Sequence, residues 1–106
     1  MDIRALSEAI AFNPEKMAKN VLFDSPHMFF DCYCLLPGQA QKVHAHAESD
    51  KVYLVMEGTG RFTIGEETRD LGPGHAVIAR AGEPHGVANA SEDKLVLVVT
   101  MAPRPA

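Results

Sequence analysis

Two histidines separated by one residue, His44 and His46, are the residues of this chain whose type and spacing best suit chemistry. They are flanked by valine and alanine and not by turn-forming residues, and this pattern is typical of a β-strand. Successive side chains of a strand point to opposite faces, so both imidazoles share one face, about 6.6–7 Å apart. Two imidazoles at that separation can bind one metal ion through nitrogens roughly 2.0–2.1 Å from it. Such a pair is a weak signal alone, and a third candidate ligand downstream strengthens it.

The segment before the histidines alternates in polarity over residues 28–36. Its even-numbered positions are apolar, whereas the odd-numbered positions include Asp31 and Tyr33. This pattern predicts a strand whose even face lies in a core. Pro37 and Gly38 then turn the chain into the histidine strand. We expect the even face to form the apolar wall of a pocket beside the histidines, made of Met28, Phe30, Cys32 and Cys34.

The rest of the chain consists of short apolar segments with turn signals every 8–12 residues and almost no helical pattern. This organisation predicts an all-β sandwich or barrel. Residues 52–56 and 95–99 are apolar on both strand faces, so we expect the outer face to be covered too, most simply by a second subunit in a homodimer. In addition to the histidine strand, we expect strands at residues 16–23, 28–36, 52–57, 61–64, 76–79 and 95–101.

A length of 106 residues and a mass of 11.5 kDa allow one domain. Residues 1–15 are expected to form a short N-terminal helix or arm, because apolar residues recur there at helical spacing until Asn13-Pro14 ends the pattern. Residues 16–101 are expected to form the barrel domain. The prolines of the tail, residues 102–106, prevent sheet pairing, so we expect the tail to be frayed.

The charge and hydropathy of the chain argue against several classes of partner. The net charge is −4 and no run of lysine or arginine forms a patch, so neither nucleic acid nor an anionic membrane is an expected partner. No apolar segment approaches the roughly 18–20 residues of a membrane span, and the N-terminus lacks the order of a signal peptide. We therefore expect a cytoplasmic protein in which Cys32 and Cys34 are buried, reduced thiols.

The spacing around the histidine pair resembles a known family. Gly38, five residues, His44-Ala45-His46, and then residues 52–57 closed by Gly58 resemble the first motif of the cupins. That motif consists of a glycine, an H-x-H pair, an acidic residue and a closing glycine.

A second segment resembles the other cupin motif. Gly74, five residues, Arg80-Ala81-Gly82, two residues, His85, three residues and Asn89 match its spacing, although the family usually has proline where Arg80 stands. Together the two motifs imply a double-stranded β-helix, or jelly-roll barrel, in which both line one mouth. By that resemblance His44, His46 and His85 are metal ligands that face a ligand pocket.

The sequence departs from the family at the position of the acidic ligand, which is Lys51 here. A protonated amine has no lone pair and repels a divalent cation, so it cannot replace a carboxylate. Asp50 could supply the carboxylate if a bulge shifts the register by one residue, or Glu48 could supply it from the following turn. Alternatively the site has three histidines with water or substrate at the other positions, or Lys51 faces an anionic substrate as its counter-charge.

Three neutral ligands leave the identity of the metal open among Fe, Zn, Ni, Cu and Mn. Tyr53 shares the strand parity of Lys51 and should point into the barrel, either as a substrate-binding or acidic group or as a core residue with a satisfied hydroxyl. Asn89 and Glu48 fit groups that orient imidazoles, and surface or turn placement fits them equally well. His27 and His75 are expected at the surface.

The sequence therefore predicts a small cupin that binds a divalent transition metal in the barrel mouth. Our first hypothesis is a metal-dependent enzyme, an oxygenase (such as a dioxygenase), isomerase or lyase, that acts on a small anionic metabolite, with Lys51 and Tyr53 as candidate catalytic residues. The second is a non-catalytic cupin that senses or sequesters a metal or a small ligand. The fold alone does not decide between them.

Overall fold

The computed structural model describes residues 1–105, which form one short helix and nine strands. The helix is α1 (Leu6–Ala9), and its four residues are far fewer than a membrane-spanning helix needs. The strands are β1 (Ala18–Ser25), β2 (Met28–Leu35), β3 (Ala40–His44), β4 (Asp50–Glu57), β5 (Gly60–Ile64), β6 (Glu67–Leu71), β7 (Ala76–Ala79), β8 (His85–Ala88) and β9 (Leu95–Ala102).

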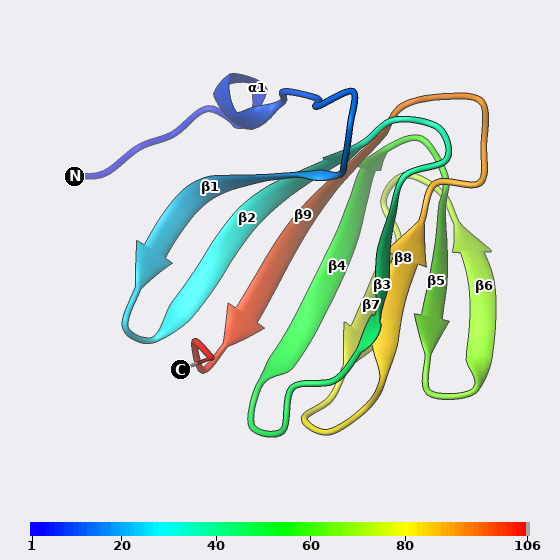
Figure 1. Cartoon of the computed structure of the whole chain (residues 1–106). Coiled ribbons are helices and arrows are strands. Elements are labelled where there is room, and N and C mark those ends of the chain that lie inside the picture. Colours follow the sequence, from blue (N-terminus) through cyan, green and yellow to red (C-terminus); the bar gives the residue numbers. More distant parts are fainter. Residues whose placement is uncertain (106) are drawn as a thin grey trace.

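The strands form two antiparallel sheets that face each other (Figure 1). One sheet has five strands in the order β1-β2-β9-β4-β7, and the other has four in the order β3-β8-β5-β6. Strands that are neighbours in sequence repeatedly cross from one sheet to the other, as β3 and β4 do. This is the double-stranded β-helix that the two motifs predicted, and the prediction of an all-β barrel with a short N-terminal helix is confirmed.

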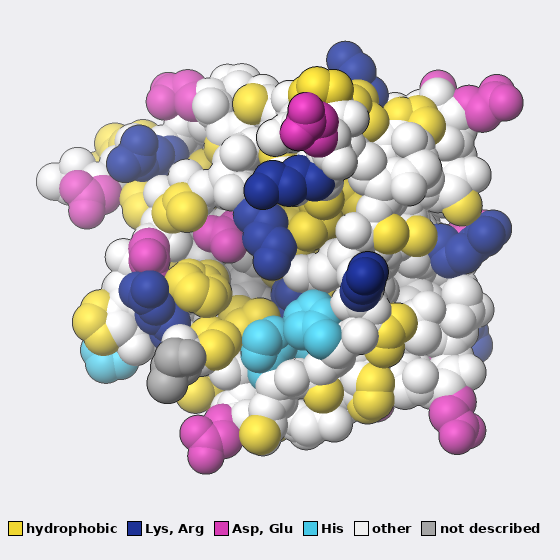
Figure 2. All heavy atoms as spheres, in the orientation of Figure 1, with side chains coloured by type: hydrophobic (Ala, Val, Ile, Leu, Met, Phe, Trp, Pro, Cys, Tyr) yellow, Lys and Arg dark blue, Asp and Glu magenta, His cyan; other side chains and the backbone are white. Residues whose placement is uncertain are grey.

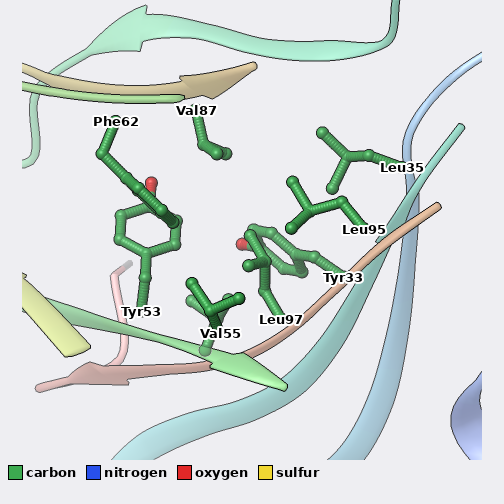
Figure 3. Packing of buried hydrophobic residues seen from close by; sticks show 9 residues of the cluster. Tyr33, Leu35, Tyr53, Val55, Phe62, Val87, Leu95 and Leu97 are labelled. Carbon is green, nitrogen blue, oxygen red and sulfur yellow. The ribbon is translucent and has the colours of Figure 1, made fainter. Parts of the chain in front are cut away.

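The space between the sheets is filled by one apolar cluster, shown in Figure 3. Strand β2 contributes Tyr33 and Leu35 to it, and their partners on β9 are Leu97 and Leu95. The cluster is made of Tyr33, Leu35, Tyr53, Val55, Phe62, Val87, Leu95, Leu97 and Val99. The odd-numbered residues of β2 therefore face the barrel interior.

The even-numbered residues of β2 lie on the opposite face, so the predicted pocket wall is wrong. Cys32 and Cys34 are fully buried outside the barrel, in a second cluster with Leu22 and Val96. Their sulfur atoms are 3.7 Å apart and both thiols are free, as expected from the sequence. Both faces of β2 are buried over this stretch, which is why the apolar pattern alone did not reveal which face is internal.

The N-terminal arm covers this second cluster. The side chain of Asn20 holds the arm by donating hydrogen bonds to the carbonyl oxygens of Ala9 (2.8 Å) and Ala11 (3.0 Å). Leu6 and Phe12 pack against the cluster. Part of the apolar outer face is thus covered by the chain itself. The remainder stays partly exposed on the neighbouring strands, at Val52, Leu54, Val98 and Met56.

The C-terminal tail is held against the body of the protein, so the expectation of a frayed tail is wrong for residues 102–105. Ala102 still pairs with Asp50 across β9 and β4. The hydroxyl of Ser49 donates a hydrogen bond to the carbonyl oxygen of Pro103 (2.7 Å), and the guanidinium of Arg104 binds the carboxylate of Asp24 (2.7 Å). These contacts place the tail beside the loop that follows the histidine pair.

Candidate metal centre

Three histidines from two elements and one loop converge at one end of the barrel. His44 ends β3, His46 follows in the loop to β4, and His85 begins β8. Each offers a ring nitrogen, and these atoms all lie within 4.8 Å of one another. The ring centroids are 4.9 Å apart for His44 and His46, 4.4 Å for His44 and His85, and 5.5 Å for His46 and His85. The convergence that the spacing implied is present.

The local pairing of β3 and β8 brings the histidines together. His44 lies directly opposite His85, and the register shifts between Gln41 and His44. Such an irregularity bends the strand and redirects its side chains. Gly86 allows the close approach, because a Cβ at this position would meet the carbonyl oxygen of Gln41 at 2.8 Å and the backbone nitrogen of Val43 at 3.0 Å.

Hydrogen bonds orient two of the three rings. Nδ1 of His44 lies 2.7 Å from the carbonyl oxygen of Lys42, and Nδ1 of His85 lies 2.9 Å from that of Glu83. A carbonyl only accepts, so each Nδ1 carries the proton and donates, which leaves Nε2 with a free lone pair. Nε2 of His85 is buried and has no hydrogen-bond partner among the described residues. A buried ring nitrogen in this state fits a metal ligand.

The surroundings favour neutral imidazoles, which is the form that binds metal. Burial lowers the pKa of both His46 and His85. The positive charge of Lys51 lowers the pKa of these two histidines further. Three neutral nitrogen donors that lie within 4.8 Å of one another suit a divalent transition metal.

Lys51 and Tyr53 lie inside the barrel, as their strand parity predicted. Their exposed fractions are 1% and 0%. The amine of Lys51 (3.1 Å) and the hydroxyl of Tyr53 (2.8 Å) both donate to Oε1 of Gln41. The ring of Tyr53 also lies 6.3 Å from that of His85. Burial lowers the pKa of Lys51 to about 7 and raises that of Tyr53.

Two polar residues of this interior were missed from the sequence. Gln41 joins Lys51 to Tyr53, and its polar side chain in a predicted strand was the available signal. Asp31 was placed on the polar face of β2, yet it is only 9% exposed and its Oδ1 has no hydrogen-bond partner among residues 1–105. Burial raises the pKa of Asp31, and the nearby Lys51 partly opposes that effect. Asp31 and Tyr33 are both odd-numbered positions of one strand, and this shared face was the signal that could have placed Asp31 in the interior.

The acidic residues considered as ligands lie elsewhere. Asp50 is exposed, and its Oδ1 accepts a hydrogen bond from the backbone nitrogen of Ala81 (2.8 Å). Glu48 is exposed in the loop after His46. Neither belongs to the group that could hold a metal ion, which consists of the three histidines. The structure therefore has the arrangement of the three-histidine alternative.

The remaining candidates are also placed. Asn89 is buried, but its amide donates to the carbonyl oxygens of Leu35 (3.0 Å) and Asp93 (2.7 Å), so it organises the turn before β9 and does not orient an imidazole. His27 and His75 are exposed, as expected.

The face that carries the histidines is open to solvent. Figure 2 shows histidine side chains near the centre of this face, next to hydrophobic side chains and below positively charged ones. A cavity of about 330 Å³ adjoins His46 and is lined by Ser49, Pro103 and Arg104. The guanidinium of Arg104 lies 4.9 Å from the centre of the Phe29 ring. This cavity gives a small ligand access to His46.

The comparisons with known proteins agree with the fold and the motifs. The Cupin domain family model matches residues 32–101. The structure of TT1209 from Thermus thermophilus is 52% identical, with a TM-score of 0.96 over 99% of this chain and 100% of that chain. An RmlC-like cupin protein from Desulfovibrio desulfuricans is 27% identical, with a TM-score of 0.84 over 97% of each chain. The uncharacterized protein SCO3923 of Streptomyces coelicolor is 36% identical over 77 residues, which are 73% of this chain and 72% of that protein.

Proposed function

This chain belongs to the cupin family, and from that premise we propose that His44, His46 and His85 bind one divalent transition-metal ion in a metal-dependent enzyme. The observation that carries the proposal is the state of the three rings. Their nitrogens converge within 4.8 Å, and the buried Nε2 of His85 has no other partner among the described residues. Such an arrangement has a cost in the apo protein, which a bound metal ion would remove.

The substrate that suits this site is a small anionic metabolite. The interior beside the histidines contains the amine of Lys51, and the exposed amine of Lys19 lies 5.7 Å from the Tyr33 ring at the edge of the same interior. The exposed amine of Lys19 attracts an anion that approaches the open face, which raises the local concentration of the anion, and the amine of Lys51 lies deeper in the interior. A bound metal ion supplies Lewis acidity or oxygen activation at open coordination positions. An oxygenase, isomerase or lyase reaction is consistent with these parts.

One observation favours a second candidate, a cupin that binds a metal or a small ligand without catalysis. Lys51 and Tyr53, the two candidate proton-transfer groups, both donate to the same oxygen of Gln41. Groups held in this way stabilise the interior and are less available for proton transfer. Substituting Lys51 by Glu separates the two candidates once a substrate is known, because turnover changes only if the chain is an enzyme that uses Lys51.

We also propose that the protein works in the cytoplasm as a homodimer. The support for a dimer is the partly exposed apolar face of the five-stranded sheet, which includes Leu54, Val98 and Met56. Light scattering that gives a mass of 11.5 kDa in dilute solution would contradict the dimer.

The test of the metal site is elemental analysis of the purified, untagged protein. We expect about one equivalent of a transition metal in the parent protein and none in the His44→Ala/His46→Ala double variant, because two of the three ligands are removed. His75→Ala is the matched control, since His75 is an exposed histidine outside the cluster. If the parent carries no metal even after incubation with Fe, Zn, Ni, Cu and Mn salts, the proposal is wrong.

A further inference from the structure

Lys51 is a buried amine with little to compensate a positive charge. Its Nζ donates to one neutral acceptor, Oε1 of Gln41, and its other near neighbours are ring faces, those of Tyr33 at 5.3 Å and Tyr53 at 5.1 Å. Among the described residues no carboxylate lies within 4.0 Å of it. A buried ammonium in this setting is costly, and the amine readily exists in the neutral form.

The candidate metal centre near Lys51 lacks a negatively charged ligand. Its three ligands are neutral imidazoles, and the group that could hold a metal contains no carboxylate. A divalent ion would add its two charges to that of a protonated Lys51 in one low-dielectric interior. Lys51 and this centre share Tyr53 as a neighbour, whose ring centre lies 5.1 Å from Nζ of Lys51 and 6.3 Å from the ring centre of His85. A change that makes residue 51 anionic would therefore remove the uncompensated buried ammonium and supply the metal centre with an anionic group.

We propose that Lys51 is a site of modification by carbon dioxide, and that its Nζ is carried as a carbamate when the three histidines hold a metal ion. This inference rests on the metal site of the proposed function. In the reaction the lone pair of the neutral amine attacks the carbon of CO₂, one N–C bond forms, one C–O π bond opens, and one proton leaves to solvent. No electrons are exchanged and no other reactant is needed. The product is an anionic oxygen donor on the side chain of Lys51.

The surroundings of Lys51 suit this product. The carbamate nitrogen keeps one N–H, which can still donate to Oε1 of Gln41. The amine, with a pKa of about 7, is neutral in a large fraction of molecules near neutral pH, as the reaction requires. Lys51 is only 1% exposed, so a molecule as small as CO₂ reaches its amine more readily than a metabolite does. The charged and titratable groups that act on this position are Lys19 of β1, Asp31 and Tyr33 of β2, Tyr53 of β4, and the histidines His46 and His85.

The experiment uses the full chain with and without Zn²⁺, in buffer that contains ¹³C-bicarbonate, followed by ¹³C NMR. We expect one carbamate resonance in the zinc-loaded parent and its absence in Lys51→Arg, which keeps a positive charge but is a poor nucleophile. Lys16→Arg is the matched control, because Lys16 is an exposed lysine that precedes β1 and has no contact with the site, and its spectrum should equal that of the parent.

Zinc affinity gives a second readout that does not depend on any variant. We expect the parent to bind Zn²⁺ on the order of tenfold more tightly with bicarbonate than in CO₂-depleted buffer, the size of effect typical for groups that tune a metal site. Lys51→Glu should bind zinc tightly in both buffers, because it carries a permanent carboxylate.

The outcomes separate this inference from the proposed function. Zinc that binds at one equivalent, with no Lys51-dependent resonance and no effect of bicarbonate on affinity, overturns the carbamate and leaves the metal site intact. A protein that binds no metal overturns both. A bicarbonate effect that persists in Lys51→Arg also overturns the carbamate, because it must then arise at another group.

Discussion

The two faces of strand β2 belong to regions of opposite character. The outer face carries Cys32 and Cys34 into a fully buried cluster beneath the N-terminal arm. The inner face carries Asp31 and Tyr33 toward the histidine end of the barrel, beside the buried Lys51. Alternation along one strand therefore separates an apolar region from a polar one by the thickness of a single sheet.

The difference lies in how well each region satisfies its polar groups. In the outer region the amide of Asn20 is paired with two carbonyl oxygens of the arm. In the inner region Oδ1 of Asp31 and Nε2 of His85 are buried without partners among the described residues. Unsatisfied buried groups reduce stability, so their presence together at one end of the barrel indicates a site kept for binding. The outer cluster only stabilises the fold, whereas the interior both stabilises the fold through its apolar cluster and carries the site at its histidine end.

The most direct test of this contrast is Lys51→Met in metal-free, CO₂-depleted buffer. The pKa of Lys51 is about 7 in the folded protein and 10.5 without the fold. Between those values the unfolded chain binds a proton that the folded protein does not, so the free energy of unfolding falls as the pH is lowered. Linkage gives a loss of about 2 kcal/mol between pH 9 and pH 7. In Lys51→Met this pH dependence should disappear, and stability at pH 7 should rise by about 1–4 kcal/mol.

Urea denaturation at pH 7 and pH 9 measures this prediction. Lys42→Met, a change at an exposed lysine, should keep the pH dependence of the parent. A variant at Lys51 that is less stable than the parent at pH 7 would show that the amine contributes to stability, and the inner region would then resemble the outer one.

Local signals predicted the all-β class and the histidine pair, whereas the jelly-roll barrel and the third histidine, His85, followed from the resemblance of two motifs to the cupins. Turn residues and strand alternation give the all-β class. His44, His46 and His85 can converge because each lies at or beside a strand end. The internal face of β2 was not predictable in the same way. Both of its faces are apolar over residues 32–35, and the arm that covers one of them lies far away in sequence.

The polar interior was missed for a related reason. A buried Asp31 contradicts the usual placement of carboxylates at the surface. Its burial depends on the strands that pair with β2, which are β1 and β9. The polar side chain of Gln41 in a predicted strand was a signal, but its partners Lys51 and Tyr53 become evident only once β3 and β4 face each other across the barrel. Pairings of this kind arise from topology, which alternation along a single strand does not encode.

Matched leucine truncations test the separation of stability from binding. Leu97 is fully buried inside the barrel and pairs with Tyr33 and Val55, whereas Leu22 is 5% exposed in the outer cluster. We expect Leu97→Ala to cost about 3–5 kcal/mol and Leu22→Ala about 2–3 kcal/mol of unfolding free energy. Zinc affinity should fall in Leu97→Ala and stay within about twofold of the parent in Leu22→Ala.

Urea denaturation and zinc titration of both variants give the two quantities separately. Equal losses of zinc affinity would mean that the two sides of β2 are mechanically coupled. The division between a stabilising outer cluster and a binding interior would then not hold.

The smallest expected effect concerns the tail beside the cavity at His46. Arg104 and Asp24 form an ion pair whose side chains are 41% and 37% exposed, so Arg104→Gln should change the unfolding free energy by less than about 1 kcal/mol. The tail keeps its separate hydrogen bond from Ser49 to Pro103. Oxalate binding to the zinc-loaded protein, measured by calorimetry, is the more informative readout. If the guanidinium attracts entering anions, Arg104→Gln weakens oxalate binding about two- to threefold, whereas Asp24→Asn strengthens it by releasing the guanidinium. If the ion pair only holds the tail in place, both variants change oxalate binding in the same direction. The polar binding region would then extend no further than the histidines and would not include Arg104.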